Sequence, residues 1–269
     1  MIQFIRKFAK TFYGSVWPGF LINPIQLKPR NSLLEARMKK LAAIFLTVSI
    51  ISLILTLLPS FAEQEQPRVV SALEGKVPSD AVVLFDGKDI SGWTYMDGQP
   101  AGWKVTDGAM TVKGGSIITR KEFGDIQLHL EFATPAEAKG SGQDRGNSGL
   151  YIQGLYEVQI LDSYGNETYP DGSCAAIYKI APPLVNASRP AGTWQAYDVI
   201  FRAPGFDATG NRIRKAVITV FHNGVLVQDH LEVVPTFASE LKTEKPRGPI
   251  YLQDHNHPVK FRNIWVREL

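Results

Sequence analysis

Hydrophobic and polar residues alternate in short runs along most of this 269-residue chain. The runs end at Gly, Asn, Asp or Pro, and none after residue 80 keeps a helical repeat. Alternation with a period of two is typical of strands with one buried face. Asn223-Gly224 lies between two of the runs and is a strong hairpin signal. The pattern predicts strands at 82–85, 103–105, 109–112, 116–119, 126–132, 149–153, 156–161, 194–202, 216–222, 225–231, 250–253 and 260–268.

The segment from 145 to 163, RGNSGLYIQGLYEVQILDS, carries the most specific pattern. It predicts two strands joined by a tight turn near Gly154, with the aliphatic residues on one face. The other face would carry Asn147, Tyr151, Gln153, Glu157 and Gln159. Amides, a tyrosine and a carboxylate on one face indicate a surface that hydrogen-bonds a hydroxyl-rich ligand. A carbohydrate is therefore the expected partner, with a solvated face as the alternative.

Three further runs repeat this alternation of aliphatic and polar residues. Their polar members are Gln127, His129 and Glu131, then Gln195 and Tyr197, then Tyr251, Gln253 and His255. Many short strands and almost no helix predict an all-β domain, a two-sheet jelly-roll sandwich. We expect the polar residues to share one concave face. On that face the tyrosines at 151, 197 and 251 would be exposed.

The first 62 residues differ from the rest of the chain. Lys39-Lys40 precede an apolar run from 41 to 58, and Ser60-Phe61-Ala62 follows as a small-x-small pattern. This order predicts a signal peptide at 38–62 that starts at Met38, with 1–37 a mis-assigned extension. An uncleaved membrane anchor is the alternative. We expect a linker at 63–79, one domain at 80–269, and a periplasmic or secreted location.

Charge and cysteine content narrow the function classes. Residues 1–62 hold 8 of the 29 basic and 1 of the 26 acidic side chains, so the remainder has a net charge of about −4. Nucleic acid is therefore not an expected partner. Cys174 is the only cysteine, which leaves no internal disulfide. No Gly-rich phosphate loop precedes a helix, so no nucleotide cofactor is expected.

Four residues are candidates for chemistry. Glu157 and Asp162 are five residues apart, so a regular strand would place them on opposite faces unless it ends between them. His255 follows Gln253-Asp254 at the end of a predicted strand. Arg145 opens the hairpin, either as an ion-pair partner of Asp162 or as a donor to a substrate oxygen. Glu157, Asp162 and His255 could together hold one divalent ion, although their spacing matches no metal motif.

Seven blocks of the chain carry a resemblance to a known family. The blocks are LFDGKDISGW (84–93), WKVTDGAM (103–110), EFGDIQLHLEF (122–132), RGNSGLYIQGLYEVQILDSYG (145–165), PAGTWQAYDVIFRAP (190–204), HNGVLVQD (222–229) and GPIYLQDHNHPVKFRNIWVREL (248–269). In this order, over residues 80–269, they resemble the 3-keto-disaccharide hydrolase domain family. His257 departs from the small residue expected in the last block.

The resemblance implies a concanavalin A-like lectin or glucanase fold, export by bacteria, and cleavage of a glycoside that a separate oxidoreductase has oxidised at C3. A base would remove the C2 hydrogen, the aglycone would leave C1 by β-elimination, and water would add. Glu157 or His255 would be the base, and Arg145 or the metal would polarise the ketone. The residues expected to bind the sugar are Asn147, Tyr151, Gln153, Gln159, Gln253 and Asp254.

Two other functions fit the same pattern. Glu157-x-Gln159-x-x-Asp162 is close to the Glu-x-Asp-x-x-Glu strand of retaining glucanases, but the central carboxylate is an amide and the last one is shorter. The polar sandwich face also suits a carbohydrate-binding module without catalysis. Turnover of a glycoside oxidised at C3 would distinguish a 3-keto-glycoside hydrolase from both of these alternatives.

Overall fold

The computed structural model describes residues 32–57, 66–71, 73 and 76–269. Ser32–Leu57 form helix α2, which includes most of the predicted apolar run. Among the described residues, no helix is long and apolar enough to cross a membrane. The proposed cleavage pattern at 60–62 and most of the proposed extension lie outside the described residues.

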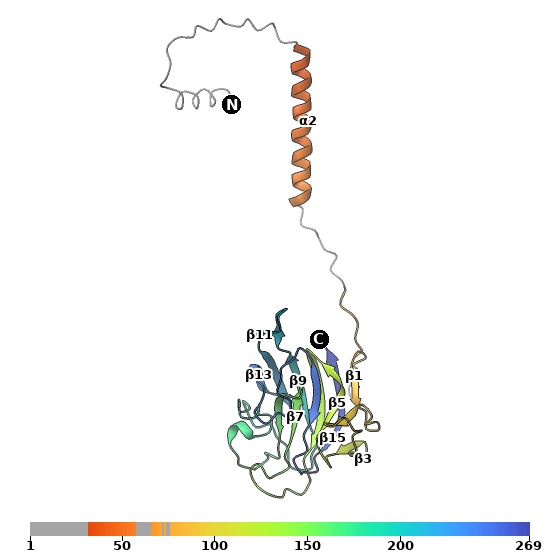
Figure 1. Cartoon of the computed structure of the whole chain (residues 1–269), viewed down its shortest axis with the longest axis vertical. Coiled ribbons are helices and arrows are strands. Elements are labelled where there is room, and N and C mark those ends of the chain that lie inside the picture. The colour runs from red at the N-terminus through yellow and green to blue at the C-terminus, as the bar shows by residue number, and fades with distance from the viewer. Residues whose placement is uncertain (1–31, 58–65, 72, 74–75) are drawn as a thin grey trace, which may run out of the picture. The chain divides into compact units, whose positions relative to one another are not determined.

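Residues 68–269 form a separate unit built from two antiparallel sheets (Figure 1). The larger sheet has the order β13-β12-β9-β6-β15-β4-β3, with β1 also paired to β15. Its strands are β1 (Val82–Phe85), β3 (Lys104–Thr106), β4 (Ala109–Thr111), β6 (Ile126–Ala133), β9 (Gln195–Arg202), β12 (Ala216–His222), β13 (Val225–Val233) and β15 (Lys260–Glu268).

The smaller sheet has the order β2-β5-β14-β7-β8. Its strands are β2 (Trp93–Tyr95), β5 (Ile117–Phe123), β14 (Gly248–Leu252), β7 (Ser148–Ile152) and β8 (Tyr156–Ile160). A two-stranded ribbon, β10 (Gly205–Phe206) with β11 (Arg212–Arg214), is separate from both sheets, and a 3-10 turn covers Pro170–Gly172. The predicted all-β sandwich is confirmed.

One hydrophobic core lies between the two sheets. Leu128 and Leu130 of β6 have no exposed surface, and neither do Leu150 and Val158 of the β7-β8 hairpin. All four belong to the same buried cluster. The aliphatic alternation of each strand therefore faces inward, as period-two burial requires.

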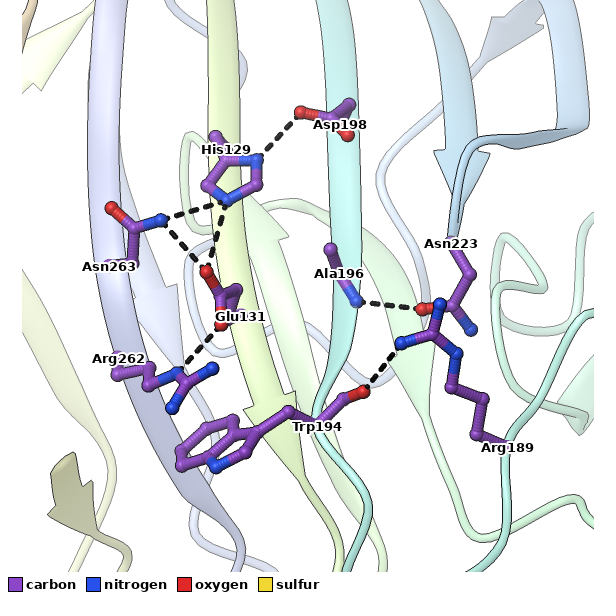
Figure 2. Close-up of polar contacts among 9 residues, drawn as sticks. All are labelled: His129, Glu131, Arg189, Trp194, Ala196, Asp198, Asn223, Arg262 and Asn263. Carbon is purple, nitrogen blue, oxygen red and sulfur yellow. Dashed lines mark hydrogen bonds and ion pairs between the residues drawn. The ribbon is translucent and has the colours of Figure 1, made fainter. Parts of the chain in front are cut away.

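The prediction of a single polar concave face is wrong. His129 and Glu131 lie on the outer face of the larger sheet, where His129 Nδ1 is 2.7 Å from Asp198 Oδ1 and Arg262 Nε donates to Glu131 Oε2 over 2.7 Å (Figure 2). The polar residues of the β7-β8 hairpin lie on the outer face of the smaller sheet. Tyr197 points into the core and is fully buried. Alternation fixes which residues share a face of one strand, but not which sheet the strand joins.

Two long segments cover the outer face of the smaller sheet. Segment 164–190 runs beside β8 and is joined to it by two backbone hydrogen bonds of 2.9 Å. The backbone N–H of Gln159 donates to the Ala176 carbonyl, and the backbone N–H of Ala175 donates to the Gln159 carbonyl. Segment 234–247 is held by the Thr236 amide, which donates to the Leu155 carbonyl over 2.9 Å. Every residue of β7, β8 and β14 is consequently buried. The expected exposure of Tyr151 and Tyr251 is wrong, because they are only 1% and 4% exposed.

Candidate active site

A pocket of about 220 Å³ lies on the outer face of the smaller sheet, between β7, β8, β14 and the covering segments. Its lining includes five of the residues predicted to bind or act on the substrate, together with polar and aromatic side chains from loops. The lining residues are Gln143, Asn147, Glu157, Gln159, Tyr169, Tyr178, Phe237, Ala238, Gln253 and His255.

Strand pairing places Glu157 in one row with two tyrosines. Tyr151 of β7 is paired with Glu157 of β8 on one side and with Tyr251 of β14 on the other. Residues paired across an antiparallel ladder project on the same face. The rings of Tyr151 and Tyr251 meet edge to face, with centroids 4.7 Å apart. This contact fixes Tyr151 beside the carboxylate.

Glu157 is a buried carboxylate that is ready to accept a proton. It is 2% exposed, and its Oε2 atom has no hydrogen-bond partner. Burial raises the pKa of Glu157 to about 7, against an opposing hydrogen bond from Tyr151. Its protonation therefore changes near neutral pH, as a general base requires.

Gln253 and Tyr151 form a hydrogen-bond chain that ends at Glu157. Gln253 Nε2 donates to the Tyr151 hydroxyl over 3.1 Å, and that hydroxyl bonds to the Glu157 carboxylate. Burial raises the pKa of Tyr151 well above its ordinary range, so the hydroxyl keeps its proton. Gln253 Oε1 is buried without a partner. Two unpartnered acceptors, Gln253 Oε1 and Glu157 Oε2, thus belong to side chains that line the pocket.

Three amide side chains form a second group in the pocket. Gln159 Nε2 donates to the side-chain Oε1 of Gln143 over 3.0 Å, and Asn147 Nδ2 donates to the backbone carbonyl of Gln143 over 2.9 Å. Gln143 itself donates to the Gly172 carbonyl over 2.8 Å. The sequence pattern missed Gln143, since it lies in a loop without periodicity.

Aromatic side chains from the covering segments also line the pocket and were missed by sequence reasoning. The hydroxyls of Tyr169 and Tyr178 are 2.8 Å apart, and the ring of Phe237 lies 5.8 Å from that of Tyr178. For Tyr169 and Tyr178, the length of segment 164–190 was the only sequence signal.

His255 lies in the pocket lining and is exposed to solvent. Its ring is stacked on that of His257, with centroids 6.1 Å apart and planes 5° apart. The imidazole therefore lies at the mouth of the pocket, whereas Glu157 is buried.

Arg145 and Asp162 lie outside the pocket lining. Arg145 Nε donates to Asp162 Oδ2 over 2.7 Å, and Arg145 Nη2 donates to the Tyr164 carbonyl over 3.1 Å. Asp162 is 1% exposed and follows the end of β8. The structure gives these two residues the ion-pair arrangement that was one of the two sequence interpretations.

Gln153 and Asp254 are also absent from the pocket lining. Gln153 has a positive φ of 54° in the β7-β8 turn, donates to the carbonyls of Phe123 and Pro246, and lines another pocket of about 260 Å³. The Asp254 carboxylate accepts hydrogen bonds from the amides of Gly115 and Asn256. Both side chains therefore hold loops.

The predicted metal ligands are not brought together. Glu157 and His255 line one pocket, while Asp162 is paired with Arg145. No group of three or more His, Cys, Asp or Glu side chains among the described residues is arranged to hold a metal ion. The three residues therefore do not fit the expected three-ligand site.

A β-sandwich with a pocket of amides, aromatic rings and one buried carboxylate defines a carbohydrate-active class of protein. The family model of the 3-keto-alpha-glucoside-1,2-lyase-like domain matches residues 80–267. The chain belongs to this family.

Individual relatives agree with this assignment. The 3-keto-disaccharide hydrolase of Bacteroides thetaiotaomicron is 22% identical, in a match that covers 78% of this chain and 86% of the relative. A solved structure of a candidate glycosyl hydrolase from Parabacteroides distasonis ATCC 8503 is 43% identical, covers 78% of this chain and 95% of its own, and has a TM-score of 0.71. A second structure from that organism, 20% identical with a TM-score of 0.53 over 71% of this chain and 94% of its own, shares the fold.

Proposed function

We propose that this protein cleaves glycosides whose sugar carries a ketone at C3, by elimination followed by hydration. Family membership and the glycosyl hydrolase relatives support a glycosidase at the general level. The distant 3-keto-disaccharide hydrolase supports the oxidised substrate. The observation that carries the proposal is Glu157, a buried carboxylate with a free oxygen and a pKa raised to about 7.

In the first step Glu157 takes the hydrogen from C2. The ketone makes this hydrogen acidic, because the electron pair left on C2 moves onto the ketone oxygen as an enolate. The enolate then collapses to a C1–C2 double bond, and the C1–O bond breaks with its electron pair on the aglycone oxygen. His255, at the mouth of the pocket, protonates that oxygen to give the free alcohol.

In the second step water adds across the double bond. Its hydroxyl joins C1, and C2 regains a hydrogen from protonated Glu157. The proton left over from water restores His255. The sum of the two steps is hydrolysis of the glycosidic bond.

The enolate needs a hydrogen-bond donor while it exists. Arg145 already donates to Asp162 and to two backbone carbonyls, so it is poorly placed to donate a hydrogen bond to the enolate. One hydroxyl of the Tyr169–Tyr178 pair donates its proton to the other. The proton of the accepting hydroxyl is then free to bond to a ligand. Burial raises the pKa of Tyr169 above its ordinary range, so this proton is present at neutral pH. The tyrosine pair is therefore the proposed donor.

The two-carboxylate route of ordinary glycosidases fits less well. It needs a second acid flanking the glycosidic oxygen. Glu157 is the one carboxylate in the pocket lining described above, and Asp162 is held by Arg145. A non-catalytic binding module would also gain nothing from a carboxylate buried at a pKa near 7.

The test is incubation of the full-length protein with 3-keto-trehalose, 3-keto-lactose and a 3-keto glucoside, beside the unoxidised sugars, with and without chelator. Release of the corresponding 3-keto monosaccharide from the oxidised substrates alone supports the proposal. Cleavage of the unoxidised sugars would instead favour an ordinary glycosidase, and sugar binding without cleavage would favour a binding module.

The proposed substrate also requires a separate oxidoreductase that oxidises the sugar at C3, and we propose that such an enzyme acts upstream. Export to the periplasm or medium remains our expectation from the segment at 38–62. Fractionation of cells, with the N-terminal residue of the exported chain determined, tests both the location and the cleavage point.

A further inference from the structure

The aromatic part of the pocket lining has no role in the elimination apart from its phenolic hydroxyls. Tyr169, Tyr178 and Phe237 form a row, with centroids 6.4 Å apart for the first pair and 5.8 Å for the second. Phe237 ends the row and is 72% exposed. We call these three residues the aromatic row.

The exposure of Phe237 is unusual for its position. Single exposed apolar residues are common on protein surfaces. Phe237, however, lines a pocket and continues a row whose other two members line the same pocket. One face of its ring packs toward Tyr178, so the rest of the ring is available to a ligand that leaves the pocket.

The two kinds of lining divide the pocket chemically. Amides and the carboxylate of Glu157 suit the hydroxyls and the reacting carbons of a sugar. The pocket volume of about 220 Å³ lies below the range of about 300–1,000 Å³ usual for drug-sized ligands, so it suits one sugar ring better than two. A leaving group attached at C1 would then extend toward the rim.

We propose that the aromatic row is a subsite for the leaving group and that it favours an aryl aglycone. Stacked or edge-to-face aromatic pairs attract each other beyond the effect of the area that they bury. A saturated leaving group of similar size would lack this attraction. This subsite rests on the proposed function, because only a glycosidase has a leaving group to bind.

The experiment compares kcat/KM for 3-keto phenyl glucoside and 3-keto methyl glucoside in the full-length protein and in Phe237→Ala. The ratio of the phenyl value to the methyl value should fall about fivefold in the variant, because one partner of the aromatic contact is lost. The change should appear mainly in KM. The ratio for Phe237→Leu should lie between those of the natural protein and Phe237→Ala. Ile213→Ala, which removes another exposed side chain on β11, should leave the ratio unchanged.

A direct binding measurement accompanies the kinetics. The dissociation constants of unoxidised phenyl and cyclohexyl glucosides are measured by calorimetry, with the preference for phenyl expected to disappear in Phe237→Ala. Equal effects of the substitution on both ligands overturn the subsite, even if 3-keto glycosides are cleaved. If no 3-keto glycoside is cleaved, the proposed function fails, and the binding preference alone then decides whether the row recognises aryl groups.

Discussion

Gly149 makes room for the carboxylate of Glu157. A Cβ atom built on Gly149 would lie 2.8 Å from Glu157 Oε1 and 2.8 Å from Cε2 of the Tyr151 ring. It would also lie 3.3 Å from Gln253 Oε1. Glycine inside a strand weakens it and often marks a close approach of other groups. Here the hydrogen-bond chain from Gln253 through Tyr151 to Glu157 depends on the absence of a side chain at position 149.

Gly149→Ala should therefore lower kcat/KM for a 3-keto glucoside by about 10²-fold, because a displacement of about 1 Å of a catalytic group can have that effect. Steady-state kinetics of the variant measures this. Gly92→Ala is the matched control, since a Cβ there meets nothing within 4 Å. Equal activity of the two variants would show that the position of Glu157 does not matter.

Glu157 should reduce the stability of the fold as the pH rises above about 4.5, with the full effect above about pH 7. Its pKa is about 7 in the folded protein and near 4.5 in the unfolded chain. The unfolded state therefore binds fewer protons between these values, and stability falls as pH rises from about 4.5 through 7. Glu157→Gln should be more stable than the natural protein by up to about 3 kcal/mol at pH 8, with no gain at pH 4. Denaturant unfolding at both pH values measures the difference, and a gain that does not change with pH would contradict it.

Tyr151→Phe should shift the pH dependence of activity. The hydroxyl of Tyr151 bonds to the Glu157 carboxylate and opposes the rise of its pKa. Without it, the rising limb of kcat/KM against pH should move upward by about one pH unit. In Tyr251→Phe the limb should stay in place, because that hydroxyl bonds to Glu240 Oε1 over 2.9 Å. A fall in activity with an unmoved limb would assign Tyr151 a packing role only.

Arg145→Met should affect stability more than activity. It leaves Asp162 buried without its partner, which lowers the free energy of unfolding by about 3 kcal/mol. Arg202→Met breaks a surface pair with Asp125 and should cost less than about 1 kcal/mol. Chemical denaturation compares the two variants. A loss of turnover in Arg145→Met without a loss of stability would return Arg145 to the role of donor to the substrate.

The sequence predicted the bounds of several strands correctly. The bounds of 82–85, 216–222 and 260–268 match β1, β12 and β15. Strands β2, β10 and β11, each two or three residues long, were missed. Sheet membership was also beyond reach, since pairing between distant strands leaves no mark on the period of either one.

The residues of the candidate site that lie on strands were predictable, and those that lie in loops were not. The side chains of Asn147, Glu157 and Gln159 meet in the pocket because they share a face of one hairpin. Gln153 departs because the chain turns there with a positive φ, which ends the strand periodicity. The loop residues Gln143 and Phe237 could not be found, because loops have no period and their positions depend on tertiary packing.

The central claim is that Glu157 removes the C2 proton of an oxidised sugar. The most direct test is the pH dependence of kcat/KM for a 3-keto glucoside, measured for the natural protein and for Glu157→Gln. The natural protein should show a rising limb near pH 7, and the variant should be at least about 10²-fold slower without that limb. A variant that keeps more than about a tenth of the natural activity, with the limb intact, would contradict the role of Glu157 as the base.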